Sequence, residues 1–266
     1  GDELDLNAII EARQDLRAGQ SPDERFYSRK ERMHRDVCAV FLVDLSASTD
    51  DPIEKVDPVP LTEEEKEMIE NLRDPWDAIT AEELIEEEPK RKIIDVQREA
   101  MVVMASALDA LGDSYGIYGF SGYGKDCVEL FVAKEPNDKF TAATLRSIAS
   151  MTPKRSTRMG PAIRHGVTKL TQSGQAMKIL IILSDGFPQD CDYGPERGNH
   201  DYGVEDTAKA LEEAERKGIE TFCITVDRSG HDYLKRMCPN GRYMVIEEMN
   251  DLPDQLTKLY TLLTNR

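Results

Sequence analysis

Three oxygen-bearing side chains at alternate positions follow an apolar stretch in the first part of the chain. Asp44, Ser46 and Ser48 come directly after the run 37–43, which has the length and composition of a strand buried on both faces. Carboxylate and hydroxyl oxygens are hard ligands, which suit Mg²⁺ or Mn²⁺ better than zinc or iron. Taken alone, this triplet is as typical of an ordinary loop as of a metal site.

Two further oxygen ligands occur later in the chain. Asp185 follows the apolar run 178–184, within the sequence Leu-Ser-Asp-Gly, and Thr157 lies in a loop just before a helix N-terminus. In a doubly wound sheet, ligands bind at the carboxyl ends of the strands, beside the point where the strand order reverses. The chain therefore offers three sets of oxygen ligands that such a sheet could bring to one place.

The elements that would position these residues alternate between strands and helices, which is typical of a mostly parallel sheet covered by helices. We predict strands at 37–44, 115–120, 128–133, 178–184, 220–226 and 243–246. The second and third strands are separated by only six residues, so we expect an antiparallel hairpin there. Helices are predicted at 93–111, 161–172, 204–217 and 252–263.

Two segments fall outside this alternation. Residues 1–35 contain a predicted helix at 4–17 and form an N-terminal helical arm ahead of an α/β domain at 36–266. Within that domain an acidic insert at 51–92 separates the first strand from its helix. It holds 15 acidic and six basic residues, about half of the net charge of −17. Because the insert leaves from the candidate site, it could gate or extend a docking surface, or be a merely solvated excursion.

Composition and charge argue against several classes of protein. The net charge of −17 is unsuited to nucleic-acid binding, which needs clustered Lys and Arg. No apolar stretch is long enough to cross a membrane, and the acidic start lacks the apolar region of a signal peptide. The five cysteines are widely spread without a Cys-x-x-Cys pair, which fits a reduced, cytoplasmic protein without structural zinc.

The spacing of the oxygen ligands resembles the metal-ion-dependent adhesion site (MIDAS) of von Willebrand factor A (VWA) domains. That site combines Asp-x-Ser-x-Ser, a loop Thr before Gly-x-Ala-Ile, and Asp-Gly after the fourth strand, and this chain has all three in order. The chain is more similar still to the VWA domains of NorD and CbbO proteins, from about residue 26 to its end. The matching motifs are Asp-Leu-Ser-x-Ser-Thr at 44–49, Gly-Phe-Ser at 119–121, Ser-Thr-Arg-Met-Gly-x-Ala-x-Arg-His at 156–165 and Asp-Gly-x-Pro-x-Asp at 185–190.

This resemblance implies both a fold and a ligand set. The fold is a doubly wound, mostly parallel six-stranded sheet in the order 3-2-1-4-5-6, with the third strand antiparallel and helices on both sides. Ser46, Ser48 and Thr157 would bind Mg²⁺ or Mn²⁺ directly, and Asp44 and Asp185 would act directly or through water. A remaining coordination position would take an Asp or Glu carboxylate from a partner protein.

The resemblance also implies a role as an adaptor of a MoxR-type AAA+ ATPase, in which the ring supplies force and the VWA domain holds the client. The clients of such pairs are Rubisco and nitric oxide reductase, so we expect a protein-binding domain and no enzyme activity. A metal-dependent hydrolase or phosphatase on the same fold is the alternative, although Ser46 stands where such phosphatases need a second Asp. A metal chelatase subunit would have Asp-x-Ser-Gly-Ser-Met, from which Ala47 and Thr49 depart.

Two residues of the loop and helix around Thr157 have more than one interpretation. Arg158 would either contact an incoming carboxylate or pair with Asp50 or Asp51, and we favour the pairing. His165 falls within the following helix, and we expect a packed or capping histidine and no ligand.

The loop after Asp185 is rich in carboxylates and aromatic rings. We expect Asp190 and Asp192 to belong to a solvated turn, with a second cation site as the alternative. Tyr193 and Tyr202 flank Gly-containing segments of this loop and could line a partner surface.

Overall fold

The computed structural model describes residues 35–53, 91–194, 200–226 and 232–264, together with two short strands near the N-terminus. The chain divides into two compact units, Gly1–Arg35 and Asp36–Arg266. In the first unit, β1 (Glu3–Leu4) and β2 (Tyr27–Ser28) pair antiparallel. The helix predicted at 4–17 lies outside the described residues except for Leu4, which is in β1. Most of the acidic insert, residues 54–90, also lies outside them.

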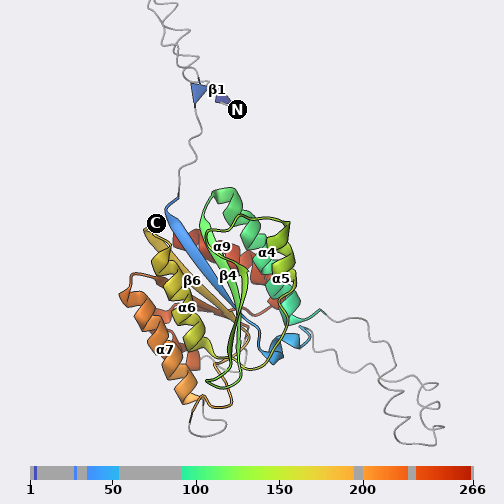
Figure 1. Ribbon diagram of the computed structural model, residues 1–266, viewed down its shortest axis with the longest axis vertical. Coiled ribbons are helices and arrows are strands. Elements are labelled where there is room, and N and C mark those ends of the chain that lie inside the picture. Colours follow the sequence, from blue (N-terminus) through green and yellow to red (C-terminus); the bar gives the residue numbers. More distant parts are fainter. Residues whose placement is uncertain are drawn as a thin grey trace, which may run out of the picture. The chain divides into compact units, whose positions relative to one another are not determined.

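A six-stranded sheet organises the second unit (Figure 1), in the order β5-β4-β3-β6-β7-β8. Its strands are β3 (Val37–Asp44), β4 (Ser114–Gly122), β5 (Val128–Lys134), β6 (Met177–Ser184), β7 (Glu220–Thr225) and β8 (Tyr243–Val245). Only the β4–β5 pair within this sheet is antiparallel. The order and the antiparallel third strand confirm the expected fold, and each strand ends within two residues of its predicted position.

The central strand β3 is buried along all eight of its residues. It pairs in parallel with β4 on one side and β6 on the other, so neither of its edges is open. Alternate side chains enter two separate cores: Ala39 and Phe41 belong to one, and Val40 and Leu42 to the other. This two-sided burial is the reason why the strand is continuously apolar in sequence.

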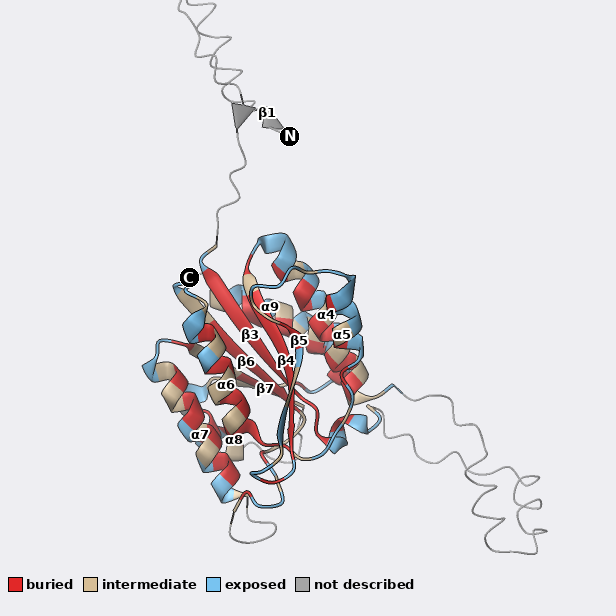
Figure 2. Ribbon diagram, in the orientation of Figure 1, coloured by how far each residue is buried: buried red, intermediate tan, exposed pale blue. Residues whose placement is uncertain are grey.

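Helices cover both faces of the sheet, and buried positions concentrate along the strands and the inward sides of the helices (Figure 2). One core includes side chains of α4 (Ile93–Leu111), α5 (Ala142–Ala149) and α9 (Leu252–Thr264). The other includes side chains of α6 (Met159–Gln172), α7 (Asp201–Arg216) and α8 (Asp232–Met237). The four predicted helices are confirmed, with α6 and α7 beginning two and three residues earlier than expected.

Two helices, α5 and α8, were not predicted. They are eight and six residues long, which is too short for the helical repeat of apolar residues to stand out. In the described part of the chain no helix is both long and apolar enough to cross a membrane. All five cysteines carry free thiols.

Candidate metal-binding site

The structure brings all five predicted ligand residues to the carboxyl ends of the two central strands. Asp44 ends β3 and Asp185 directly follows β6, which is the neighbour of β3. Ser46 precedes, and Ser48 belongs to, the short helix η1 (Ala47–Asp50). Thr157 comes from the loop before α6. The strand order reverses between β3 and β6, so the cluster lies where doubly wound sheets bind ligands.

Hydrogen bonds connect the five residues into one cluster. The Ser46 N–H donates to Asp44 Oδ1 over 2.8 Å, and the Thr157 hydroxyl donates to Asp44 Oδ2 over 3.2 Å. The Ser46 hydroxyl lies 3.1 Å from that of Ser48 and donates to Asp185 Oδ1 over 3.3 Å. Three hydroxyl groups and two carboxylates are therefore linked by hydrogen bonds within one small cluster. Hard divalent cations prefer such a set of oxygen donors.

The cluster is closed on its inner side and open on its outer side. Asp44, Ser46 and Thr157 are buried, Asp185 is partly buried, and Ser48 is exposed. A bound cation would thus be held from below by the end of β3 and reached by a partner from the side of Ser48.

The two carboxylates of the cluster have no positively charged partner in the part of the chain that the structure describes. Among the described residues no Lys, Arg or His forms an ion pair with Asp44 or Asp185. Burial and then the charge of Asp185 raise the pKa of Asp44 to about 7. Burial also raises the pKa of Asp185, against a hydrogen bond from Ser48 that lowers it. Two adjacent carboxylates without a cation are unfavourable, and a divalent ion at this point would supply the missing positive charge.

Ser184 is a member of the cluster that the sequence analysis did not identify. Its hydroxyl donates to Asp44 Oδ2 over 2.8 Å and accepts the Gly186 N–H over 3.3 Å. Its position as the last residue of β6, beside the end of β3, is the signal that could have revealed it. Because Ser184 occupies a lone pair of Asp44, it fixes the orientation of that carboxylate.

The loop that carries Thr157 is fastened to three other segments by its backbone. Ser156 forms an isolated antiparallel bridge with Gly122 at the end of β4. The Thr157 N–H donates to the Gln189 carbonyl over 2.9 Å, and the Ala47 N–H donates to the Arg155 carbonyl over 2.7 Å. These bonds hold Thr157 against the loops that follow β3 and β6.

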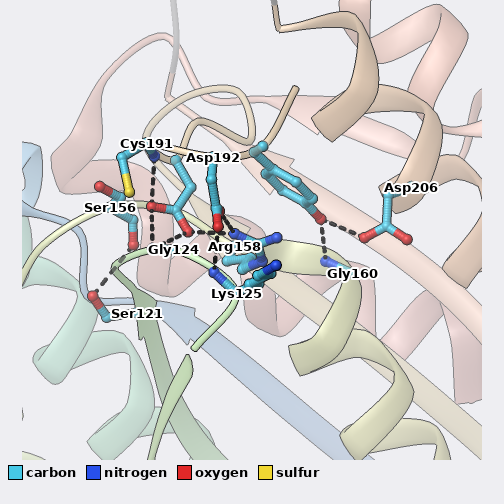
Figure 3. A network of polar contacts seen from close by, with 11 residues as sticks. Ser121, Gly124, Lys125, Ser156, Arg158, Gly160, Cys191, Asp192 and Asp206 are labelled. Carbon is cyan, nitrogen blue, oxygen red and sulfur yellow. Dashed lines mark hydrogen bonds and ion pairs between the residues drawn. The ribbon is translucent and has the colours of Figure 1, made fainter. Parts of the chain in front are cut away.

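Arg158 pairs with the loop that follows Asp185, and the expected pairing with Asp50 or Asp51 is wrong. Its Nη1 lies 2.8 Å from Asp190 Oδ2 and also contacts Asp192, as Figure 3 shows in part. Asp50 instead pairs with Lys92 over 2.9 Å. The loop after β6 folds back over the start of α6, and this contact between distant segments decides the partner of Arg158.

The expectation of a solvated turn is wrong for Asp190. Its side chain is 0% exposed, and its carboxylate accepts the Gly124 N–H over 2.9 Å and the Cys191 N–H over 2.7 Å. These hydrogen bonds and Arg158 lower the pKa of Asp190 against the opposing effect of burial. Asp190 therefore ties the hairpin between β4 and β5 to the loop after β6.

Tyr193 does not line an exposed surface, in contrast to the expectation. It is buried, and its hydroxyl donates to Asp206 and accepts the Gly160 N–H over 3.2 Å. Figure 3 labels these two partners, Gly160 and Asp206. A Cβ at position 160 would lie 1.9 Å from Asp206 Oδ2, so any larger residue there would displace the Asp206 side chain. Tyr202, by contrast, is 56% exposed and packs edge-on against Tyr193.

His165 lies away from the cluster and packs against an aromatic ring. Its imidazole meets Tyr118 edge-on with ring centroids 5.7 Å apart. Burial and the nearby Lys169 lower the pKa of His165, against the opposing effect of Glu135. This position agrees with the expected packed histidine.

The fold and this cluster together define a VWA-type domain, and comparison with known proteins shows the same. Residues 90–259 match the family described as von Willebrand factor type A domain. The match covers more than half of the chain, and the chain therefore belongs to the VWA family. It begins after β3, so the cluster residues Asp44, Ser46 and Ser48 lie outside the matched region.

Curated relatives with similar sequences include several proteins named NorD. The chain is 29% identical to Protein NorD of Brucella melitensis over 263 residues, 99% of this chain and 35% of the relative. It is also 29% identical over 263 residues to an uncharacterized protein of Pseudomonas aeruginosa, of which it covers 37%. The chain thus spans about a third of the length of these relatives.

Solved structures with the same fold are far more distant in sequence. The PilB minor pilin from Streptococcus sanguinis aligns with a TM-score of 0.61 at 13% identity, over 90% of this chain and 64% of that chain. The vWF domain of the pilus tip protein Mfa5 from Porphyromonas gingivalis aligns with a TM-score of 0.55 at 11% identity, over 86% of this chain and 96% of that one. At such identities the likeness concerns the fold alone.

Proposed function

We propose that this chain is a Mg²⁺-dependent, MIDAS-type protein-binding domain without catalytic activity of its own. The observation that carries the proposal is the cluster at the ends of β3 and β6, in which Asp44 and Asp185 lie side by side and form no ion pair with a cation of the described ranges. Ser46, Ser48 and Thr157 would hold the ion through their hydroxyl oxygens, and the two carboxylates would balance its charge.

The open side of the cluster is where a partner would complete the site. Mg²⁺ takes six oxygens and readily keeps some water ligands, so a position remains beside the exposed Ser48. An Asp or Glu side chain of a partner can replace a water there. Binding would then depend on the metal and on a single carboxylate of the client, and the same arrangement would serve Mn²⁺.

Similarity to NorD proteins supports an adaptor role. In this proposal the domain docks a client, of the Rubisco or nitric oxide reductase type, for remodelling by a MoxR-type AAA+ ATPase. The proposal places the domain in the cytoplasm, which agrees with three buried free thiols, Cys38, Cys223 and Cys238.

Titration calorimetry with Mg²⁺ and Mn²⁺ tests the metal site. The wild type should bind about one equivalent, and Asp44→Asn and Thr157→Val should abolish or strongly weaken binding. Thr168→Val, an exposed threonine in the same helix region, is the matched control and should bind like the wild type. Absence of binding in the wild type, or equal binding by Thr157→Val, would contradict the proposal.

Metal-dependent capture tests the partner step. Client and ATPase should bind the wild type in Mg²⁺, and should be lost after chelation or in Asp44→Asn. Retention of both partners by the variant would show that docking does not use this cluster.

A further inference from the structure

An exposed arginine and an exposed tyrosine lie beside the candidate metal site. The Tyr123 side chain, in the turn between β4 and β5, is 56% exposed. The guanidinium carbon of Arg155 lies 5.2 Å from the centroid of the Tyr123 ring, within the range of a cation–π contact. The ring thus holds an exposed guanidinium in place without neutralising its charge.

The backbone of Arg155 is attached directly to the metal-binding loop. Its carbonyl accepts the N–H of Ala47, the residue between Ser46 and Ser48, over 2.7 Å. Its own N–H donates to the Ser121 hydroxyl over 3.1 Å. The backbone of Arg155 is therefore fixed beside Ala47, between two of the candidate ligands.

Arg155 differs from Arg158, three residues further on, in having no carboxylate partner among the residues that the structure describes. Arg158 is buried and bound by Asp190 and Asp192. Arg155 is exposed and forms no ion pair with any carboxylate in the described ranges. Other exposed cations of the described ranges, such as Lys125 and Arg146, likewise form no ion pair there. What distinguishes Arg155 is its contact with the Tyr123 ring and the bond between its backbone and Ala47.

Exposed charges of opposite sign come from different segments around the cluster. The exposed Lys154 and Arg155 belong to the loop that carries Thr157, whereas the exposed Asp50 ends η1 and the exposed Asp51 follows it. Lys92 offsets the charge of Asp50. A partner with several negative charges would be attracted toward Arg155 and repelled from Asp51.

We propose that Arg155, supported by Tyr123, is a second recognition point for an acidic segment of the partner protein. This inference rests on the proposed function: the first carboxylate of the segment reaches the metal and a second one pairs with Arg155. The partner would then be selected by a pair of carboxylates, and the domain would discriminate against segments with only one.

Two short peptides test this directly. In saturating Mg²⁺, acetyl-Gly-Glu-Gly-Glu-Gly-amide and acetyl-Gly-Glu-Gly-Gln-Gly-amide are titrated by NMR into the whole chain. Alternate positions of an extended peptide place both side chains on one face. Its two carboxylates give the first peptide a factor of about two in affinity by counting alone. The wild type should bind it about a further two- to fivefold more tightly, as expected for an exposed ion pair, and this excess is the preference attributed to Arg155. The preference should shrink at high salt.

Variants locate the second contact. Arg155→Gln should remove the preference while leaving Mg²⁺ binding and the affinity for the single-carboxylate peptide unchanged. Tyr123→Leu should reduce the preference, because the guanidinium loses its support. Arg216→Gln is the matched control: it removes an exposed arginine at the end of α7, which by topology lies at the opposite edge of the sheet, and it should keep the preference.

The outcomes separate this inference from the function on which it rests. Mg²⁺-dependent binding of both peptides without this preference, or an unchanged preference in Arg155→Gln, would overturn the second recognition point and leave the adhesion site intact. Tighter binding of both peptides by Arg155→Gln would mean that Arg155 holds an acidic segment of this chain, and would also overturn it. Failure of both peptides to bind in Mg²⁺ would count against the adhesion site itself.

Discussion

This domain has two pairs of neighbouring carboxylates, Asp190 with Asp192 and Asp44 with Asp185, and their surroundings shift the pKa values of the two pairs in opposite directions. Asp190 and Asp192 are met by Arg158 and by backbone N–H groups, and the pKa of each is lowered. Asp44 and Asp185 are met by hydroxyl groups and by each other, and the pKa of each is raised.

The difference indicates which pair is structural and which is prepared for a ligand. Arg158 balances the negative charge of Asp190 and Asp192. These two carboxylates therefore hold three loops together without a bound cation. The second pair, at the end of the central strand, has no such cationic side chain among the described residues. A cation is therefore expected at Asp44 and Asp185 and not at Asp190 and Asp192.

The largest effect on stability is expected from removing Arg158, the cation that pairs with Asp190 and Asp192. Arg158→Ala leaves the fully buried Asp190 side chain without its ion-pair partner, which typically costs about 3 kcal/mol or more. Urea unfolding should show this loss. Arg216→Ala removes an exposed arginine and should change stability by at most about 0.5 kcal/mol. Equal effects of the two changes would mean that the Arg158 network contributes little.

Adding a divalent cation should stabilise the wild type by a comparable amount. At 100 times the dissociation constant, ligand binding raises the free energy of unfolding by about 2.7 kcal/mol. Asp44→Asn should lose this response to Mg²⁺, whereas Asp190→Asn should keep it even though its starting stability is lower. Loss of the response in Asp190→Asn alone would reverse the roles assigned to the two pairs.

The two pairs should give opposite dependences on pH in the presence of chelator. Because the pKa of Asp44 is raised to about 7, the folded state binds more protons than the unfolded state between about pH 4 and 7. Stability from this group therefore falls as the pH rises through that window, by at most about 1.4 kcal/mol per pH unit. Asp44→Asn should flatten this decline in unfolding curves recorded from pH 4 to 8.

The contribution of Asp190 to stability should depend on pH in the opposite direction. The lowered pKa of Asp190 contributes stability that is present above the ordinary pKa of an aspartate and is lost as the pH falls through the folded value. Asp190→Asn should therefore reduce the acid sensitivity of the protein below about pH 4. If the variant lost stability below about pH 4 as steeply as the wild type, the contact between Asp190 and Arg158 would contribute little.

The smallest effect is expected at Ser184. Ser184→Ala removes a hydrogen bond to Asp44 and should cost about 1 kcal/mol, with weaker Mg²⁺ binding because the carboxylate loses its fixed orientation. Ser106→Ala, which removes a hydroxyl bonded to a helix carbonyl on an exposed position, is the control. A Ser184→Ala protein with unaltered Mg²⁺ affinity would show that this orientation is unimportant.

The sequence predicts the central part of this domain well, for a physical reason. A strand buried on both faces must be continuously apolar, so β3 and β6 are visible as runs, and the residues that end them are fixed at one edge of the sheet. The apolar runs place Asp44 and Asp185 at strand ends, and the strand order implied by the resemblance to VWA domains places those two ends side by side.

The partners of Arg158 and the burial of Tyr193 could not be predicted in this way. Asp190 is 32 residues from Arg158 in sequence, and their contact depends on how the loop after β6 folds back. Neither loop has an apolar repeat that would reveal its path. The short helices α5 and α8 escaped prediction because their stability depends on packing against the sheet and not on their own sequence.

The most direct measurement is a crystal structure of the chain grown with Mn²⁺, with the ion located by anomalous scattering. We expect one strong anomalous peak among the hydroxyl oxygens of Ser46, Ser48 and Thr157, beside the carboxylates of Asp44 and Asp185. No ion is expected at Asp190 and Asp192. A peak at the Arg158 network, or an empty cluster at the end of β3 in saturating Mn²⁺, would contradict this expectation.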